Sequence, residues 1–240
     1  METKIKFILT SLLIISTLLL AGCNESNTDK ILSDSDKTEL NKYLVNMDGN
    51  VEILLFTSEN SCFSCSKTET LMKELDQLSN KISLKIYDLE EDNKMATKYD
   101  IELVPAIVII GREDYGIKHY GFPGGKEFLP LLETIVYSSM PQPQVDEQLA
   151  KKLNAIENPV EVKVFVSPTC PSCPDMVRIA NSYSIISDKI STVIIMSNEF
   201  ERYSETYKIS AVPTTIINDN FKKEGYMNEE IFINYVVVSS

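Results

Sequence analysis

Short apolar runs and helically spaced apolar positions alternate along most of the chain. Residues 51–56 form a β-rich apolar run, after which Leu71, Leu75 and Leu78 recur at helical spacing with Lys and Glu between them. The pattern then predicts strands at residues 82–88, 106–110 and 117–121 and helices at residues 93–99 and 126–138. Strands that alternate with helices in this way predict an α/β fold with a mixed central sheet.

The same order of elements returns after residue 140. Strands are predicted at residues 160–166, 190–196 and 214–217, with one helix reaching about residue 186 and another running through residue 203. Pro141-Gln142-Pro143 marks the boundary between the two halves. The chain is therefore expected to hold two similar domains, over residues 38–140 and 141–240.

Two Cys-x-x-Cys pairs and two Val-Pro pairs share the register of this repeat. Each member of the first half lies 108 positions before its counterpart in the second. The matched positions are Cys62 with Cys170, Cys65 with Cys173, Val104 with Val212 and Pro105 with Pro213. Four coincidences in one register indicate two copies of one domain.

The start of the chain has the pattern of an export signal. Lys4 and Lys6 precede an apolar stretch over residues 7–20, which is too short to span a membrane comfortably. The stretch ends in Leu20-Ala21-Gly22-Cys23, which resembles the cleavage box of bacterial lipoproteins. The alternative is a single uncleaved anchoring helix, and in both cases the remainder of the chain is exported.

The lipoprotein resemblance implies that residues 1–22 are removed and that Cys23 is lipidated. Residues 23–37 are rich in Ser, Asn and Asp and are expected to form a flexible tether. The expected location is therefore the extracytoplasmic face of the cell membrane, with the acylated Cys23 inserted in the lipid bilayer.

The composition is that of a folded, acidic protein. The 240 residues are 43% hydrophobic and 24% charged, and 35 acidic against 23 basic side chains give a net charge of −12. No basic run interrupts this balance, which excludes nucleic acid as a partner. The single histidine, His119, leaves little for a Ser-His-Asp triad or a multi-histidine metal site and is expected to be structural.

The cysteine pairs are expected to lie at the amino ends of helices. Two thiols separated by two residues can close a disulfide there, and the unpaired amides and dipole of the helix stabilise a thiolate. Cys62 and Cys170, at the exposed helix ends, are the expected nucleophiles. Cys65 and Cys173 are the expected resolving thiols, and neither a cofactor nor a metal is required. The intervening serines, 64 and 172, could donate hydrogen bonds to the sulfurs.

A strand, a Cys-x-x-Cys at a helix start and a Val-Pro that opens a later strand together resemble the thioredoxin fold. The tandem arrangement, with Tyr120-Gly-Phe-Pro-Gly-Gly125 closing the first half, resembles the two-domain protein disulfide oxidoreductases that are also called glutaredoxin-like. The resemblance covers about residues 38–238 and implies two tandem thioredoxin-like domains, each a mixed sheet flanked by helices. The same double fold occurs at the amino end of alkyl hydroperoxide reductase flavoproteins, where typically only the second pair persists.

The resemblance also implies roles for the two Val-Pro pairs. Pro105 and Pro213 match the family's cis-proline, which faces the cysteines and leaves the backbone of Val104 or Val212 free to pair with an extended substrate. Thioredoxin has a buried acid in the strand before its active site. The equivalent stretches here hold only Glu59, in a turn, so the sequence does not name a proton acceptor.

These observations favour a redox-active, membrane-anchored thiol:disulfide oxidoreductase with a role in cell redox homeostasis. It is expected to reduce, form or isomerise disulfides in exported proteins, to exchange electrons with a membrane thiol–disulfide carrier, and to relay electrons between its two sites. In that relay the Cys170 pair is expected to meet substrate and the Cys62 pair the redox supplier. Two alternatives stay open, a metal-binding module built from the two pairs and a non-catalytic lipoprotein scaffold.

Overall fold

The computed structural model describes residues 30–60, 62–141 and 146–240. The proposed signal peptide and Cys23 lie outside the described residues, and so does the tether up to residue 29. Within the described ranges, no helix combines the length and the apolar character that crossing a membrane requires.

The first half follows the predicted order of strands and helices. Its elements are α1 (Asp34–Leu44), β1 (Val51–Thr57), α2 (Cys65–Leu78), β2 (Ile82–Asp88), α3 (Asn93–Lys98), β3 (Ala106–Ile110), β4 (Asp114–Tyr120), η1 (Gly125–Glu127) and α4 (Phe128–Ser138). Strand β1 pairs in parallel with β2 and antiparallel with β3, and β3 forms an antiparallel hairpin with β4. This confirms the predicted hairpin.

The second half repeats the pattern. Its elements are α5 (Glu147–Asn154), β5 (Val160–Val166), α6 (Cys173–Ile186), β6 (Ile190–Met196), α7 (Glu201–Thr206), β7 (Thr214–Ile217), β8 (Phe221–Glu224) and α8 (Glu229–Val238). Strand β5 pairs in parallel with β6 and antiparallel with β7, which pairs with β8. The repeat seen in the sequence is therefore a repeat of topology.

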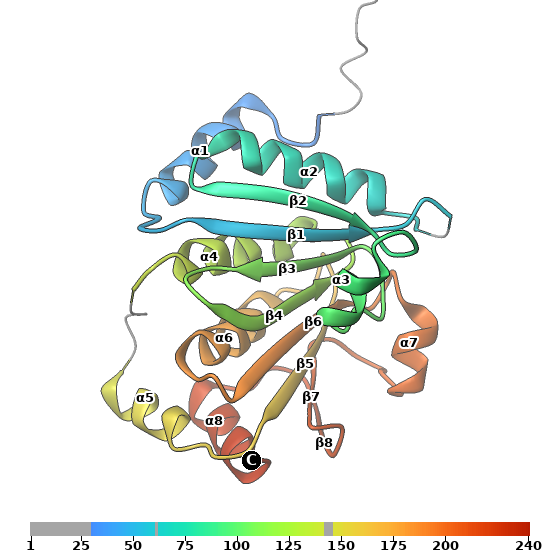
Figure 1. Ribbon diagram of the computed structural model, residues 1–240. Helices are drawn as coiled ribbons and strands as arrows, with labels where there is room; N and C mark the ends of the chain where they lie inside the picture. The colour runs from blue at the N-terminus through green and yellow to red at the C-terminus, as the bar shows by residue number, and fades with distance from the viewer. Residues whose placement is uncertain (1–29, 61, 142–145) are drawn as a thin grey trace, which may run out of the picture.

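The two halves share one continuous sheet, which the sequence did not predict. Its strand order is β2-β1-β3-β4-β6-β5-β7-β8, and the parallel pair β4–β6 joins the halves. Figure 1 shows the strands of both halves following one another in a single twisted layer. Because β1, β4, β6 and β5 all run in the same direction, β1 and β5 end at the same edge of the sheet. Each Cys-x-x-Cys follows one of these two ends.

A core common to both halves covers one face of the sheet at the junction. Leu54 and Phe56 of β1 belong to the same buried cluster as Phe165 of β5 and Ile195 of β6. On the other face, α4 of the first half packs against α6 of the second. The halves are thus joined by backbone hydrogen bonds, shared apolar side chains and helix packing.

The first domain begins earlier than predicted, so the expected tether over residues 23–37 is wrong for its last part. Leu32 is only 6% exposed, and the side chain of Ser33 caps α1 by accepting a hydrogen bond from the Asp36 N–H. The backbone N–H groups of Ile31 and Leu32 donate to the Glu74 carboxylate of α2 at 3.2 and 2.8 Å. Residues 30–37 therefore belong to the first domain.

Candidate redox centres

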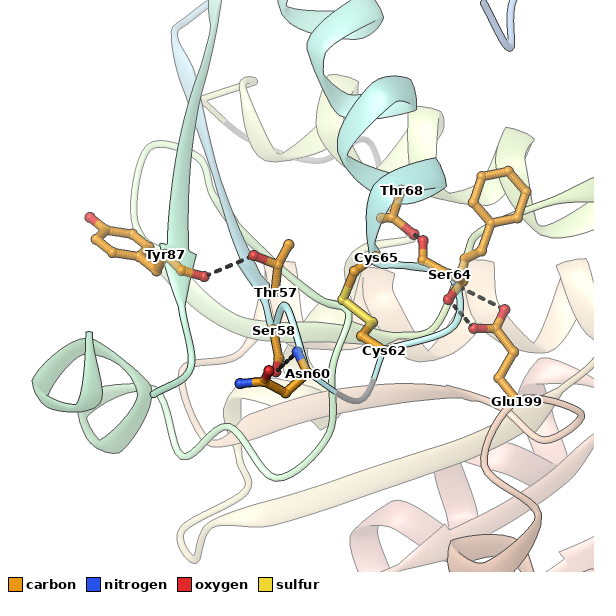
Figure 2. Close-up of a disulfide and its surroundings, with 10 residues drawn as sticks. Thr57, Ser58, Asn60, Cys62, Ser64, Cys65, Thr68, Tyr87 and Glu199 are labelled. Atoms are coloured by element: carbon orange, nitrogen blue, oxygen red, sulfur yellow. Dashed lines mark hydrogen bonds between the residues drawn. A yellow bond between two sulfur atoms is a disulfide. The ribbon is translucent and has the colours of Figure 1, made fainter. Parts of the chain in front are cut away.

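The first cysteine pair forms a disulfide in the loop between β1 and α2. The Cα atoms of Cys62 and Cys65 are 5.4 Å apart, and Cys65 is the first residue of α2 (Figure 2). Cys65 is buried, whereas Cys62 is partly exposed and Phe63 beside it is fully exposed. A large disulfide or dithiol partner can therefore approach this pair from the Cys62 side.

The second pair has the same geometry but lies deeper. Cys170 and Cys173 form a disulfide with a Cα–Cα separation of 5.5 Å, and Cys173 begins α6. The Cys173 N–H donates to the Cys170 sulfur at 3.1 Å, a contact that stabilises a thiolate there. Cys170 is only 6% exposed, so the expectation of an exposed first cysteine is wrong for this pair.

The two prolines of the Val-Pro pairs lie beside the ends of the strands that carry the cysteines. Ala106, next to Pro105, pairs with Phe56 at the end of β1, and Thr214, next to Pro213, pairs with Phe165 near the end of β5. Both Val-Pro peptide bonds are cis, as expected. Val104 and Val212 are partly buried and precede the prolines at the same edge of the sheet.

The serines between the cysteines differ in their hydrogen bonds. The Ser64 hydroxyl donates to the carboxylate of Glu199, a residue of the second half (Figure 2). The Ser172 hydroxyl lies 4.0 Å from the Cys170 sulfur, at the limit for a hydrogen bond to sulfur. The hydrogen bond to sulfur that the sequence allowed is therefore not made by Ser64.

Glu127 is a candidate functional residue that the sequence did not reveal. It is 1% exposed, and neither carboxylate oxygen has a hydrogen-bond partner among the described residues. Burial raises the pKa of Glu127 from 4.5 to about 7, against an opposing effect of Arg178. Glu127 ends η1, which packs against α6 next to the second pair. A carboxyl group near the second pair can thus gain or lose a proton at neutral pH.

Sequence reasoning missed Glu127 because it lies in the other half of the chain. In the second half, the strand before the cysteines contains no acid near its end, so the neighbouring sequence offers no proton acceptor. The available signal was an acidic residue directly after Gly124-Gly125-Lys126, where a glutamate precedes an apolar helix. The contact of η1 with α6 is needed to show that this glutamate lies near the second cysteine pair.

His119 lies in the core and takes no part in either centre. It is on β4 opposite Ile194 of β6, within the junction of the two halves, and is 3% exposed. Burial lowers the pKa of His119 from 6.5 to about 3, so the ring is neutral at physiological pH. This agrees with the structural role expected from the sequence.

The four paired cysteines form two separate disulfides rather than one tetrathiolate site. Over residues 30–60, 62–141 and 146–240, no group of three or more His, Cys, Asp or Glu side chains is arranged to hold a metal ion.

The chain is similar in sequence to several redox proteins. The family model described as a thioredoxin domain matches residues 160–237. A protein named NADH dehydrogenase from Ferdinandcohnia aciditolerans is 28% identical over 201 residues, which cover 83% of this chain and 36% of that protein. The F component of alkyl hydroperoxide reductase from Staphylococcus aureus is 28% identical over 191 residues, covering 80% and 35%. The chain therefore spans about a third of the length of these curated relatives.

Two solved structures share the double fold. The N-terminal domain of alkyl hydroperoxide reductase AhpF from Enterococcus faecalis superposes with a TM-score of 0.80 at 21% identity, over 85% of this chain and 99% of that one. A protein disulfide oxidoreductase from Aeropyrum pernix superposes with a TM-score of 0.78 at 24% identity, over 88% and 95%. At these identities the similarity establishes the fold.

The chain therefore has the thioredoxin fold twice, and each half carries a disulfide at its Cys-x-x-Cys, an arrangement that can exchange disulfides with a partner. It is a tandem form of this fold, in which the two halves share one eight-stranded sheet.

Proposed function

We propose that the protein is a lipid-anchored, extracytoplasmic thiol:disulfide oxidoreductase that acts on cysteines of exported proteins. The observation that carries the exchange chemistry is that two disulfides, each at a helix start beside a cis Val-Pro bond, lie at one edge of the shared sheet. The anchor rests on the lipoprotein-like box that ends at Cys23. The direction of electron flow follows from the potentials of the two pairs.

Exchange at the second centre needs only sulfur chemistry and one proton acceptor. In the reducing direction the Cys170 thiolate attacks a partner disulfide, forms a mixed disulfide and releases one partner sulfur as a thiolate. The Cys173 thiol then loses its proton and its thiolate attacks the Cys170 sulfur, which frees the second partner sulfur. Two electrons pass to the partner, and its two thiolates take up protons. The oxidising direction reverses these steps.

Glu127 is the proposed proton acceptor for the Cys173 thiol. Its pKa of about 7 and its unpaired oxygens allow it to take up that proton during attack and return it to solvent afterwards. The Cys173 N–H, which contacts the Cys170 sulfur, supports the thiolate that leaves or attacks.

Proposed partners are exported proteins that contain cysteines and a membrane thiol–disulfide carrier. The proposed relay passes electrons from one pair to the other. In the structure the pair with the more exposed first cysteine is Cys62–Cys65, which favours this pair as the one that meets a large protein. This is the reverse of the order expected from the sequence. A Cys62→Ser, Cys65→Ser chain with full steady-state turnover from a physiological donor would exclude the relay.

The exchange reaction is tested with the full-length chain in detergent. It is equilibrated in defined glutathione buffers and alkylated, and peptide mass spectrometry reports each pair separately. Potentials near or below about −250 mV indicate a reductase, and values of about −120 to −180 mV indicate an oxidant or isomerase. Absence of exchange at both pairs would overturn the enzymatic proposal.

The anchor is tested independently. The full-length chain is expressed in a bacterial host with a radiolabelled fatty acid, next to a Cys23→Ala variant. The expected result is label in the membrane fraction of the unmodified chain and none in the variant. Equal labelling of both chains, or of neither, would contradict lipidation at Cys23.

A further inference from the structure

Glu199 reaches from the second half of the chain into the first redox centre. Its carboxylate accepts one hydrogen bond from the Ser64 hydroxyl, inside the Cys62–Cys65 motif, and another from the Phe122 N–H at 2.9 Å. Figure 2 shows the Glu199 carboxylate meeting Ser64 at the start of α2. The first centre is therefore completed by a residue more than 130 positions away in the sequence.

The shared sheet explains why the first centre receives Glu199 while the matched residue of the other loop makes no such contact. Glu199 lies in the loop between β6 and α7, and β6 is the strand that pairs with β4 across the two halves. Its repeat counterpart is Glu91, in the loop between β2 and α3. Strand β2 is the edge strand farthest from the second half, and Glu91 is exposed.

Ser64 lies at the start of α2 without capping the helix. A serine in the N-cap position usually has an extended backbone and accepts a hydrogen bond from a first-turn amide, as Ser33 does at α1. Ser64 occupies the N-cap position of α2, but its backbone (φ −110°, ψ 4°) is not extended and its side chain makes no cap, and its hydroxyl donates to Glu199. Ser64 is itself 5% exposed, so this hydroxyl is fixed in a buried position between the disulfide loop and the carboxylate.

We propose that Glu199 is a positioning residue of the first redox centre and that its carboxylate, held by Ser64, disfavours the thiolate of Cys62. A negative charge held on the cysteine motif, here through the Ser64 hydroxyl, raises the free energy of a thiolate formed in that motif. The reduced pair then becomes less stable relative to the disulfide, which makes the first centre the stronger reductant. Lys67, whose Nζ lies 4.1 Å from the centre of the Phe122 ring, is the cation of α2 beside this contact and is exposed. The inference rests on the proposed exchange activity of the first pair.

The central variant is Glu199→Gln in the full-length chain, because glutamine removes the charge and keeps one acceptor for Ser64. We expect the pKa of Cys62, measured from the pH dependence of alkylation of the reduced chain, to fall by about 0.5–1 unit. The glutathione equilibrium of the first pair is expected to shift about 3- to 10-fold towards the dithiol, which corresponds to about 14–30 mV. The second pair should keep its equilibrium.

Two further variants distinguish the effect of a carboxylate bound at the motif from the effect of changing the net charge of the protein. Glu91→Gln removes the same charge at the matched position of the other loop and should leave the pKa of Cys62 unchanged. Ser64→Ala removes the contact between the carboxylate and the motif, although the Phe122 N–H still binds Glu199. It should lower the pKa of Cys62, and adding Glu199→Gln to it should produce little further change. Such non-additivity is the mark of two residues that act through one contact.

The possible outcomes are distinct from those that bear on the function. Failure of both pairs to exchange in the unmodified chain would refute the enzymatic proposal, while the alkylation profile of Cys62 would still test Glu199. An unchanged pKa of Cys62 in Glu199→Gln overturns the inference, as does an equal shift in Glu91→Gln. Strictly additive effects of Ser64→Ala and Glu199→Gln would also overturn it, since Glu199 would then not act through Ser64.

Discussion

Lys126 in the first half donates its backbone N–H to the carbonyl oxygen of Pro168, two residues before Cys170, at 3.0 Å. The residue before it, Gly125, has φ of +60°, and a Cβ atom at that position would clash with the same oxygen. The close approach of the two backbones therefore requires glycine at position 125. The halves touch at the second redox centre itself as well as along the sheet.

Gly125→Ala should weaken this contact and disturb the second pair. The left-handed backbone and the clash with Pro168 together are expected to lower the free energy of unfolding by about 1–3 kcal/mol. Urea denaturation measures this loss, and glutathione equilibration should show a shifted equilibrium for Cys170–Cys173 with the first pair unchanged.

Gly225→Ala provides the matched control. Gly225 also has a positive φ, +84°, but a Cβ there meets nothing within 4 Å, so the expected cost is only the backbone strain of about 1 kcal/mol. Equal losses of stability in the two variants, with an unchanged second pair in both, would contradict a specific role for the contact with Pro168.

Phe63→Ser should slow disulfide exchange with proteins without slowing exchange with small disulfides. Phe63 is fully exposed and adjacent to Cys62, so its removal should leave the free energy of unfolding within about 0.5 kcal/mol. Exchange with a protein disulfide should slow by about 10- to 100-fold, because a docked partner would bury this ring, which is worth about 1.5–3 kcal/mol. Exchange with a small disulfide should keep its rate.

The control for Phe63→Ser is Val45→Ser, which removes another highly exposed apolar side chain, at the carboxyl end of α1. It should alter neither rate. A Phe63→Ser chain that slows equally with both kinds of disulfide would show that the ring affects the chemistry of Cys62 rather than docking.

Local patterns predicted the strands and the cysteine geometry well. The predicted strands at residues 82–88, 106–110, 160–166, 190–196 and 214–217 have the observed bounds. For β3, β5, β6 and β7 such agreement is expected, because each is a short apolar run that is almost wholly buried and bounded by polar turns. Strand β2 is mostly half-buried or exposed. The cis Val-Pro bonds also followed from their register with the cysteines.

The contacts between the halves could not be predicted in the same way. The sequence of β4 does not indicate that it pairs with β6, because its backbone could form the same hydrogen bonds with another edge strand. Glu127 and Glu199 each lie against the opposite half of the chain, so their positions beside the cysteine pairs depend on how the halves are joined. The polar composition before residue 38 likewise gave no sign that Leu32 is buried, because the segment is held by hydrogen bonds from Ile31 and Leu32 to the distant Glu74 carboxylate.

Glu74→Ala should detach the segment before α1 from the first domain. Glu74 is buried, accepts the N–H groups of Ile31 and Leu32, and lies 3.5 Å from the Lys37 ammonium. Loss of the carboxylate leaves two amides without their partner, which should lower the free energy of unfolding by about 1–3 kcal/mol. Limited proteolysis near residues 30–37 should become faster than in the unmodified chain.

Glu69→Ala, on the same helix, controls for charge and helix propensity. Glu69 forms an exposed i,i+4 ion pair with Lys73, so its removal should cost no more than about 0.5 kcal/mol. Proteolysis before α1 that is equally fast in both variants would show that Glu74 does not anchor the segment.

Glu127→Gln should change stability in a pH-dependent way. The folded-state pKa of Glu127, about 7, lies above its ordinary value of 4.5. Between these values the folded chain holds a proton that the unfolded chain has lost, so stability falls as the pH rises from 4.5 through 7. The penalty above pH 7 reaches about 3 kcal/mol at 1.36 kcal/mol per unit, and glutamine removes it. The variant should be more stable by up to this amount at pH 8 and equally stable near pH 4.

The same substitution should impair the second centre while it stabilises the fold. Glutamine cannot take up the proton of Cys173, so single-turnover exchange at that pair should slow by roughly 10- to 100-fold at neutral pH. Glu59→Gln, which alters an exposed carboxyl group, should change neither property. If the Glu127→Gln chain is more stable and exchanges at the normal rate, Glu127 destabilises the fold but takes no part in proton transfer. A buried, unpaired carboxylate destabilises a fold, so its removal should not lower stability. Loss of both stability and exchange would therefore indicate that the carboxyl group makes a structural contact.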